Sequence, residues 1–261
     1  MNRNKAILIT GAASGIGLAT AGLFAGANWF VGILDKNKES LKALEAEIGP
    51  EKCFSMVTDV TCPAGVREAI ETFTRRTGGT LDVLFNNAGI LKFGTFENVS
   101  LEDKLKIVDV NFKGVINCVH YALDSLKNTP GAHIIAMASA SAVYGVPDLS
   151  VYSSTKSAIC RLTEALDIEL EPYGIVVSDI LAPYVQTPMV TCAENVAFSV
   201  KKMGVKIQPV EVARLVWKAA HARKLHWKMG QSTRFLWGLF WLMPFVRRYV
   251  VKALAVNPNS K

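Results

Sequence analysis

The sequence predicts a single α/β domain built on a doubly wound parallel sheet. Short apolar runs rich in β-branched residues alternate along the chain with longer stretches of helical period, which indicates repeated βαβ units. The short runs are apolar nearly throughout, as expected for parallel strands that helices cover on both faces. The chain has 261 residues, of which 50% are hydrophobic, and this is enough material for one large core.

The expected elements follow one another without a repeat, a low-complexity tract or a linker. The strands are expected at Ala6–Ile9, Phe30–Leu34, Cys53–Val57, Val83–Asn86, His133–Ala138 and Val176–Leu181. Helices are expected at Ile16–Ala27, Lys38–Ile48, Ala64–Thr77, Leu101–Leu126, Ser153–Leu170 and Val210–Ala222. Pro63 and Pro209 stand near two of the helix starts, where a missing N–H costs little. In such a sheet the ligand crevice opens at the carboxyl ends of the strands.

The N-terminal segment and the cysteines predict a cytoplasmic protein. The first apolar run covers only Ile7–Ile9 before a glycine turn, which is too short for the core of a secretion signal. Five cysteines are an odd number without a CxxC pair, and they fit neither a disulfide framework nor a zinc site. The four histidines, His120, His133, His221 and His226, show no ligand spacing, so no metal is expected.

A glycine-rich segment, Thr10–Gly17, directly follows the first expected strand and precedes an apolar helix. A pyrophosphate needs close approach of the backbone and a helix N-terminus whose N–H groups point at it, and glycines without a Cβ allow both. The segment therefore predicts a dinucleotide-binding loop. The alternative is a tight strand-to-helix turn that binds no ligand.

Asp35 ends the second expected strand, at about the separation from the glycine loop at which an acid reaches the adenosine ribose hydroxyls. A carboxylate there repels a 2′-phosphate, and the loop carries no Lys or Arg to attract one, so NAD(H) is the favoured cofactor. Lys36 and Lys38 are close enough to leave NADP(H) open. The alternative is that Asp35 is a solvated turn residue at the end of a strand.

Tyr152 and Lys156 are four residues apart, so on a helix they share a face. A free phenol, with a pKa of about 10, is a poor base near neutrality, and a neighbouring ammonium favours the phenolate. No other tyrosine of the chain has a lysine at this offset. The pair is therefore a candidate for acid/base chemistry with Tyr152 as the proton carrier.

These residues resemble the short-chain dehydrogenase/reductase family over roughly Lys5–Met189, in the family's order. The family's TGxxxGxG loop is matched by Thr10–Gly17, its NNAG by Asn86–Gly89 and its YxxxK by Tyr152 and Lys156. The resemblance implies the Rossmann fold and an NAD(P)-dependent enzyme that transfers hydride between nicotinamide and a CH–OH group.

Two more catalytic positions follow from the resemblance. The family's serine after the fifth strand matches Ser139, thirteen residues before Tyr152, and its active-site asparagine matches Asn111. The resemblance implies that Ser139 hydrogen-bonds the substrate oxygen, that Asn111 binds a water in a proton relay, and that Lys156 holds the nicotinamide ribose and lowers the pKa of the tyrosine. Taken singly, Ser139 and Asn111 would each favour an ordinary capping or buried polar role, because Ser and Asn often satisfy local backbone groups.

The resemblance also implies a set of cofactor contacts. Asp59 and Val60 match a pair that contacts adenine, and Asn87 matches a residue that braces the central strand. Tyr184 departs from the family's pattern, which has glycine after the proline. The full expected cofactor set is Gly11, Ser14, Gly15, Ile16, Gly17, Asp35, Asp59, Val60, Asn87, Ala88, Gly89, Tyr152, Lys156, Pro183, Val185 and Thr187.

The C-terminal part of the chain differs from the rest in charge and composition. Residues 201–261 carry a net charge of +12 and residues 1–200 a net charge of −5. Within the single domain, residues 1–189 are expected to form the cofactor-binding and catalytic core, 190–208 a substrate lid and 234–256 an apolar, basic extension. Tyr144 either lines the substrate pocket or packs in its loop.

The extension contains an apolar run, Phe235–Val246, that Pro244 is expected to break. A helix that crosses a bilayer needs about 20 apolar residues, so this run is too short to span. Three interpretations remain open. The run packs on the domain or on a partner subunit, it lies in a membrane interface where its basic residues favour anionic lipid, or it caps a lipophilic substrate pocket.

The leading functional hypothesis is an oxidoreductase that acts on a secondary alcohol or ketone, lipophilic or small, with a lipid or acyl carbonyl reductase at the membrane surface as a variant. A catalytically silent dinucleotide sensor is the alternative, although a sensor has no need of the proton donor Tyr152. The basic C-terminus lacks a recognition motif for nucleic acid, so no such partner is expected. The resemblance suggests a homodimer or homotetramer joined through the helices that bear Asn111 and Tyr152.

Overall fold

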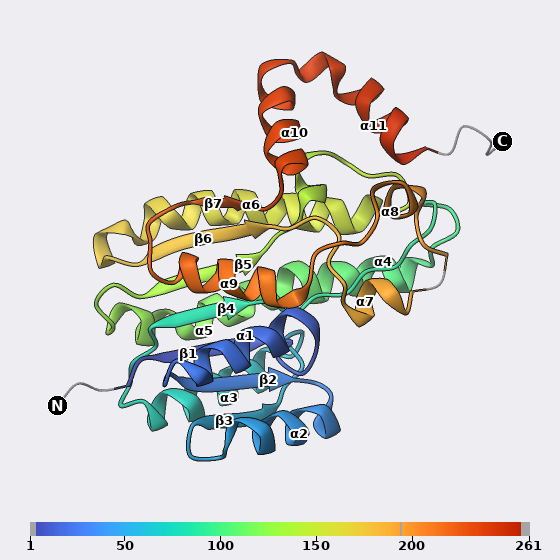
Figure 1. The fold of residues 1–261 in the computed structure, drawn as a ribbon. Helices are drawn as coiled ribbons and strands as arrows, with labels where there is room; N and C mark the ends of the chain where they lie inside the picture. The colour runs from blue at the N-terminus through green and yellow to red at the C-terminus, as the bar shows by residue number, and fades with distance from the viewer. Residues whose placement is uncertain (1–3, 194, 257–261) are drawn as a thin grey trace.

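Seven parallel strands form one sheet in the computed structural model, which describes residues 4–193 and 195–256. Figure 1 shows the sheet, whose strands lie in the order β3-β2-β1-β4-β5-β6-β7. The strands are β1 (Ala6–Thr10), β2 (Phe30–Asp35), β3 (Cys53–Val57), β4 (Val83–Asn86), β5 (His133–Met137), β6 (Val176–Leu181) and β7 (His226–Lys228). The strand order reverses between β1 and β4, which is where a doubly wound sheet binds its ligand. The predicted fold class is confirmed.

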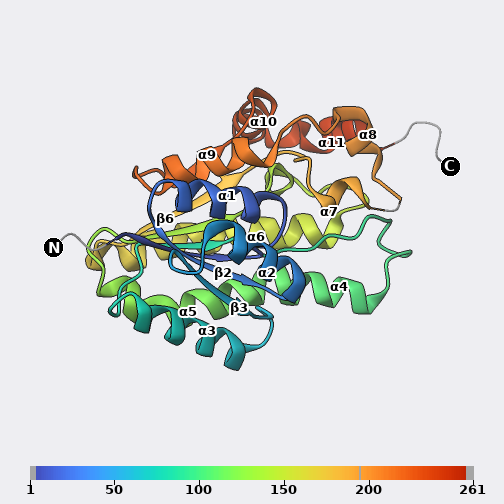
Figure 2. The same cartoon turned by 60° about the horizontal axis from the view of Figure 1, so that its bottom comes forward.

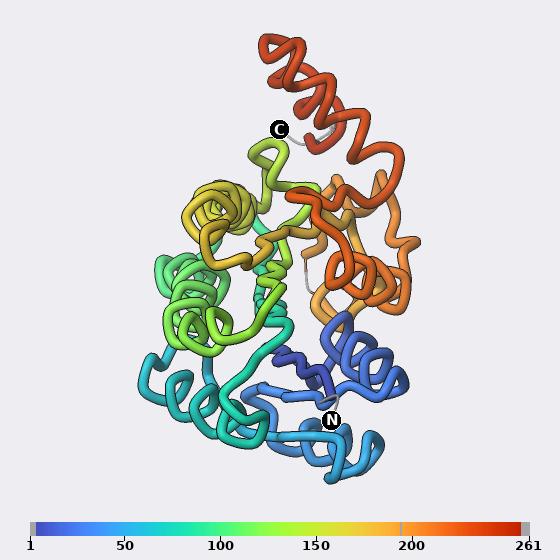
Figure 3. Tube along the Cα trace, turned by 90° about the vertical axis from the view of Figure 1, so that its left-hand side faces the viewer, coloured from blue at the N-terminus to red at the C-terminus, as the bar shows by residue number. Residues whose placement is uncertain are grey.

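Two layers of helices cover the sheet, as Figures 2 and 3 show from different sides. One face packs against α1 (Gly15–Gly26), α2 (Lys38–Ile48) and α9 (Pro209–Ala219). The other packs against α3 (Pro63–Arg76), α5 (Gly114–Lys127) and α6 (Ser150–Leu170). Pro63 and Pro209 are the first residues of α3 and α9, because the first helical N–H needs no intrahelical partner.

The strand β1 shows why the pattern of apolar runs predicted the sheet so well. Its five residues are all buried. Because side chains alternate along a strand, Ala6 and Leu8 face one helix layer and Ile7 and Ile9 face the other. Because both faces need apolar groups, the run carries no polar interruption. The six predicted strands agree with the structure to within one residue at each end.

The expected helix Leu101–Leu126 consists of three consecutive segments. The helix α4 (Leu101–Val108) continues into a π-helical turn at Asp109–Lys113 and then into α5. The backbone of Gly114 lies against Val60, since a Cβ at this glycine would be 2.7 Å from Val60 Cγ2. A π turn inside an α-helix frequently marks a functional site, and this one contains Asn111.

The strand β7 was not predicted from the sequence. It has three residues, each partly exposed, and is held at the edge of the sheet by pairing with β6. The His226 imidazole contacts the buried Asp179 carboxylate, with Nδ1 2.9 Å from Oδ2. So short a segment shows no periodicity of its own, and its strand conformation depends on the neighbour it pairs with.

The segment expected to be a lid contains two short helices, α7 (Pro188–Thr191) and α8 (Phe198–Met203). Residue 194 of this segment, and residues 1–3 and 257–261 of the expected domain, lie outside the described residues. Val185, just before the lid, forms an isolated parallel bridge with Ile207, which follows α8. The bridge closes the lid segment into a loop anchored at both ends.

The C-terminal extension stands above the rest of the molecule in Figures 1 and 3. The helix α10 (Gln231–Leu242) is followed by a 3₁₀ turn at Pro244–Val246 and by α11 (Arg247–Ala255). The expected break at Pro244 is thus confirmed, because proline has no N–H for the preceding helix. Among the described residues, none of the helices is long and apolar enough to cross a membrane.

Candidate active site

The glycine loop between β1 and α1 requires glycine at several positions. Gly11 and Gly15 have φ angles of +63° and +52°, in the left-handed region that a Cβ disfavours. At Gly17 a Cβ would lie 2.1 Å from the carbonyl oxygen of Gly11, so a larger residue would force the loop open. The loop conformation therefore depends on the residues that the sequence pattern singled out.

The N-terminus of α1 points into the crevice beside this loop. Ser14 occupies the N-cap position, but its side chain makes no capping hydrogen bond. Ser14, Gly15 and Ile16 all line the cavity described below. Because the first N–H groups of a helix have no intrahelical acceptor and carry a partial positive charge, this end suits an anion such as a diphosphate.

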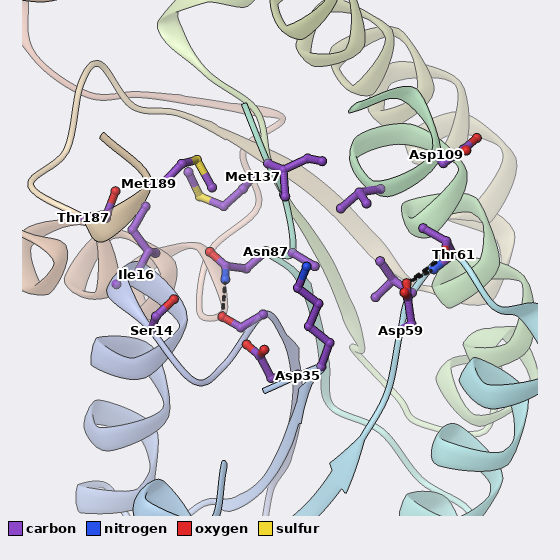
Figure 4. A pocket seen from close by; sticks show the side chains of 18 of the residues that line it. Ser14, Ile16, Asp35, Asp59, Thr61, Asn87, Asp109, Met137, Thr187 and Met189 are labelled. Carbon is purple, nitrogen blue, oxygen red and sulfur yellow. Dashed lines mark hydrogen bonds between the residues drawn. The ribbon is translucent and has the colours of Figure 1, made fainter. Parts of the chain in front are cut away.

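A cavity of about 360 Å³ runs along the carboxyl ends of the central strands. In Figure 4, Ser14, Ile16 and Thr187 lie on one side of it and Asp59 and Thr61 on the other. Its walls are formed by Gly11, Ser14, Gly15, Ile16, Asp35, Lys36, Thr58, Asp59, Val60, Thr61, Asn87, Ala88, Gly89, Ile90, Lys106, Asp109, Val110, Met137, Ala138, Tyr152, Lys156, Thr187, Pro188 and Met189. The glycine loop and the Tyr152–Lys156 pair therefore share one cavity.

Asn87 holds the loop against the end of β4. Its Nδ2 donates to the carbonyl oxygens of Thr10 at 3.0 Å and of Gly11 at 2.9 Å, and Figure 4 shows the side chain in the middle of the site. In the opposite direction, the backbone N–H groups of Asn87 and Ala88 donate to Thr10 Oγ1, each at 3.1 Å. These bonds set the width of the crevice where the two strands diverge.

Charged groups gather at the β2–β3 end of the cavity. Asp35 accepts a hydrogen bond from the backbone N–H of Ala13 at 3.1 Å, which orients its carboxylate toward the glycine loop. Asp59 accepts from the backbone N–H and the hydroxyl of Thr61. The Thr61 N–H, with Lys36 and Lys106 nearby, lowers the pKa of the Asp59 carboxyl. This end thus carries both acids and lysines.

The opposite end of the cavity holds Tyr152 and Lys156, one turn apart on α6. Lys156 is buried, and its Nζ donates to the carbonyl oxygen of Met137 at 2.7 Å. The same nitrogen lies 5.6 Å from the centroid of the Tyr152 ring. Ser139, which follows β5, hydrogen-bonds the phenol of Tyr152. The three groups come from two elements that the sheet brings together.

Burial dominates the ionisation of this pair in the protein alone. It raises the pKa of Tyr152 to about 12, although the hydrogen bond with Ser139 acts in the opposite direction. It lowers the pKa of Lys156 to about 8. The expectation that the ammonium lowers the tyrosine pKa is thus outweighed by desolvation, because Lys156 directs its charge to the Met137 carbonyl and both groups lie away from water.

Asn111 is fully buried in the π turn and does not line the cavity. Its Oδ1 accepts from the backbone N–H of Ile90 at 2.8 Å, and its Nδ2 donates to the Ile90 carbonyl at 2.9 Å. Its Oδ1 and Lys156 Nζ both approach Gly89, where a Cβ would lie 3.3 Å and 3.6 Å from them. Asn111 therefore sits beside the lysine and fixes the segment after β4.

The structure places most, but not all, of the expected site residues at the cavity. The expected residues that do not line it are Gly17, Asn111, Ser139, Pro183 and Val185. The cavity residues that sequence reasoning missed are Lys36, Thr58, Thr61, Ile90, Lys106, Asp109, Val110, Met137, Ala138, Pro188 and Met189. Thr58, Met137 and Ala138 directly follow or end strands, so the rule that ligands bind at the carboxyl ends of strands was a usable signal for them.

Tyr184, the residue that departs from the expected glycine, has a specific set of neighbours. Its hydroxyl lies 2.8 Å from Ser199 Oγ in α8. Tyr184 and Tyr152 pack against the same apolar cluster, and the Tyr184 phenol contributes to raising the pKa of Tyr152. In the described part of the chain, no group of three or more His, Cys, Asp or Glu side chains could hold a metal ion.

Together, a glycine-lined crevice at a topological switch point, a free helix N-terminus and a buried Tyr–Lys pair define a dinucleotide-dependent oxidoreductase. The model of the short chain dehydrogenase family matches residues 5–196. The chain belongs to this family.

Similar proteins agree with this assignment. The cyclohexanol dehydrogenase of Acinetobacter sp. (strain SE19) is 32% identical over 217 residues, which cover 82% of this chain and 86% of that protein. The structure of the 3-ketoacyl-(acyl-carrier-protein) reductase of Brucella melitensis, complexed with NADH, superposes with a TM-score of 0.78 at 29% identity, over 87% of this chain and 97% of the other.

A second solved structure carries the other type of cofactor. The alcohol dehydrogenase of Thermococcus sibiricus, complexed with 5-hydroxy-NADP, has a TM-score of 0.76 at 26% identity and covers 87% of this chain and 96% of the other. The protein is therefore an oxidoreductase of CH–OH groups with a nicotinamide dinucleotide as its cofactor.

Proposed function

We propose that this protein interconverts a lipophilic secondary alcohol and its ketone with NAD(H), using Tyr152 as the acid/base. The observation that carries the proposal is that Tyr152 and Lys156 line the same cavity as the glycine loop and the free N-terminus of α1. The nicotinamide, when bound, supplies or accepts the hydride.

Each catalytic side chain has a role that its surroundings support. Tyr152 donates its proton to the carbonyl oxygen during reduction and accepts one from the alcohol during oxidation. Ser139, which hydrogen-bonds the phenol, stabilises charge on the same substrate oxygen. Lys156 holds the nicotinamide ribose and supplies positive charge beside the phenol. Asn111 lies close to Lys156, where it would bind a water that relays protons to the lysine.

The preference for NAD(H) over NADP(H) rests on Asp35. Its carboxylate lines the cavity and is oriented toward the glycine loop by the Ala13 N–H, so it repels a 2′-phosphate and can bond ribose hydroxyls. Lys36 and Lys106 also line this end of the cavity. Their positive charge is partly compensated by the Asp59 carboxylate, whose pKa they help to lower. The acids therefore decide the preference.

The substrate side of Tyr152 favours an apolar compound. Tyr152 packs against a separate apolar cluster that includes Phe93, Val146, Leu149 and Val200. Tyr144 and Tyr184 border the same cluster, and burial raises the pKa of Tyr144 to about 12. Apolar walls of this kind bind a hydrocarbon chain well and stabilise a charged group of the substrate poorly.

The chain is proposed to form a homo-oligomer in the cytoplasm. Leu101 and Leu105 on α4, Ile116 on α5 and Ile168 on α6 are exposed apolar residues on the helices that bear Asn111 and Tyr152. These helices fit a homodimer or homotetramer, because their apolar side chains would be buried between subunits. The five cysteines are all free thiols, which supports a reducing cytoplasm.

The test is turnover of a panel of secondary alcohols and ketones of increasing chain length with NAD(H) and NADP(H). We expect activity that rises with apolar size and falls at least about a hundredfold in Tyr152→Phe. Tyr173→Phe, a change of the same kind at an exposed tyrosine, should keep full activity.

Cofactor affinity measured by fluorescence separates the enzyme from a sensor. An enzyme whose Tyr152→Phe variant still binds NADH but has lost turnover fits the proposal. If the unaltered protein binds NADH and turns over no member of the panel, the catalytic proposal fails and the silent dinucleotide sensor replaces it.

A further inference from the structure

The helix α10 is apolar on two opposite faces, which is unusual for a surface helix. Its inner face carries Thr233, Trp237 and Phe240, of which Thr233 and Phe240 are buried. The Trp237 ring lies 5.0 Å from the His226 ring, and the Phe240 ring lies 5.5 Å from the Tyr144 ring. The inner face therefore attaches the helix to the domain, and this attachment does not account for the apolar residues on the outer face.

The outer face and the turn that follows expose large apolar side chains. Trp241 is 78% exposed, Leu242 71% and Phe245 70%. Phe235, one turn and a half earlier on α10, is 67% exposed, and Tyr249 on α11 is 71% exposed. Large aromatic side chains in this number on one short segment indicate a surface that binds something.

The extension is attached to the domain at both of its ends. At its far end, Ala255 is buried and Val251 packs in the apolar cluster that contains Val200 of α8. Lys202 Nζ also donates to the carbonyl oxygen of Ala253 at 2.7 Å. Both α10 and α11 contact the body of the domain. Residues 234–252, which include the turn between these helices, form a projecting tip, which Figures 1 and 3 show.

The charged residues within this segment are all positive. Arg234, Arg247, Arg248 and Lys252 are exposed, and the sequence contains no Asp or Glu after Glu211. Arg247 donates to the carbonyl oxygen of Phe240 at 3.0 Å, so its guanidinium stays beside the aromatic residues of the tip. Exposed aromatic groups flanked by arginine and lysine, with no acid, match the chemistry of an anionic lipid surface.

We propose that the tip formed by residues 234–252 docks this protein on the surface of a bilayer that contains anionic lipid. The aromatic side chains would enter the interface while the four cations meet the headgroups. The docking is interfacial, because α10 has 12 residues and a spanning helix needs about 20. The surface is separate from the catalytic residues, so the proposal goes beyond the reaction.

Charge favours a bilayer over a second copy of this chain as the occupant. A twofold contact between two tips would bring both sets of four cations together without a single acid to compensate them. Headgroups of anionic lipid supply that missing negative charge. The uncompensated positive charge of the tip therefore favours binding to an anionic membrane and disfavours a dimer through this face.

The experiment is co-sedimentation of the full chain with vesicles of phosphatidylcholine alone and with vesicles that contain phosphatidylglycerol. We expect binding to the anionic vesicles that weakens in high salt. The double variant Trp241→Ser, Phe245→Ser should reduce the partition coefficient at least about tenfold, and Arg248→Gln, Lys252→Gln should do the same on anionic vesicles only.

Matched variants control for the general loss of apolar surface or charge. Val210→Ser removes an apolar group that is 41% exposed on α9, and Lys42→Gln, Lys52→Gln removes two exposed lysines near α2 and β3, at the end of the molecule remote from the tip. Both should bind vesicles like the unaltered chain. Turnover in solution should stay unchanged in every variant, which separates this test from that of the enzyme.

Two results would overturn the proposal. One is equal recovery of the unaltered chain in the supernatant with and without anionic vesicles. The other is a change of oligomeric state in Trp241→Ser, Phe245→Ser, measured by light scattering, without any change in vesicle binding, since the tip would then be an interface between proteins.

Discussion

Lys156 donates from Nζ to the carbonyl oxygen of Met137 at 2.7 Å and at the same time lies 5.6 Å from the centre of the Tyr152 ring. The lysine is therefore fixed by the end of β5, and its charge stays beside the phenol without being bonded to it. This arrangement sets how the pair responds to pH.

The rate of alcohol oxidation should rise with pH well beyond neutrality. Oxidation needs the phenolate of Tyr152, and burial raises the pKa of this residue to about 12, so the base is scarce at pH 7. Measured as kcat/KM against pH, oxidation should increase from pH 7 toward pH 8 and less steeply above it, because Lys156, whose pKa burial lowers to about 8, then loses its charge. Ketone reduction, which needs the neutral phenol, should change little below pH 8.

Lys156→Met should lower oxidation by about a hundredfold or more at pH 7, because the positive charge beside the phenol is lost. Lys127→Met, on the exposed surface of α5, is the matched control and should leave the profile unchanged. A Lys156→Met enzyme with the unaltered pH profile would contradict the role given to this lysine.

Asp35→Asn should shift the cofactor preference toward NADP(H). The substitution removes the charge that repels a 2′-phosphate and keeps an oxygen that can accept from the Ala13 N–H. We expect the ratio of kcat/KM for NADP(H) to that for NAD(H) to increase about tenfold. Glu39→Gln removes an acid four residues further on that does not line the cavity, and it should leave the ratio unchanged.

Tyr184→Phe should weaken substrate binding, because it loosens the attachment of α8 to the segment after β6. The hydroxyl of Tyr184 lies 2.8 Å from Ser199 Oγ, and this bond joins the segment after β6 to α8. Loss of one such bond costs about 1 kcal/mol, so KM for the substrate should rise several-fold, with a smaller change in kcat. Ser199→Ala should have the same effect, and the double variant should be no worse than either, because all three lack the same bond.

His133 should make the protein sensitive to acid. Burial lowers the pKa of this histidine to about 4, below its ordinary value of 6.5, so the unfolded chain binds more protons between these values. Stability from this group is complete above pH 6.5 and is lost as the pH falls toward 4, by about 2 kcal/mol at pH 5.

The variant His133→Leu should lose less stability than the unaltered protein between pH 7 and pH 5, measured by urea unfolding. The Nδ1 atom of His133 is buried without a hydrogen-bond partner, so leucine removes an uncompensated polar atom as well as the titration. His120→Leu, at an exposed position, is the control and should follow the unaltered protein.

Much of the site was predictable because its residues lie at strand ends and in short motifs. The glycine loop, Asp35 and the Tyr152–Lys156 pair all line the cavity, as expected. Ser139 and Asn111 came from the family resemblance, and neither lines the cavity: Ser139 bonds the phenol and Asn111 bonds Ile90. A linear pattern identifies such residues but does not say whether they face a ligand.

The pKa of Tyr152 illustrates what sequence reasoning missed. A lysine one turn away predicts a lower pKa for the phenol, yet burial raises this pKa to about 12. Desolvation depends on every group packed around the pair, including Tyr184 from a loop 32 residues further along the chain.

By itself the sequence determined six strands of the sheet and singled out the glycine loop and the Tyr152–Lys156 pair, because apolar runs, glycine geometry and one helical turn are local properties of the chain. Only the tertiary structure decided that His226–Lys228 forms a seventh strand, and which side of α10 faces the protein. Both faces of that helix are apolar, so its pattern could not choose between them. The choice was made by the contacts of Trp237 and Phe240 with distant segments, and it left Trp241 and Phe245 facing outward.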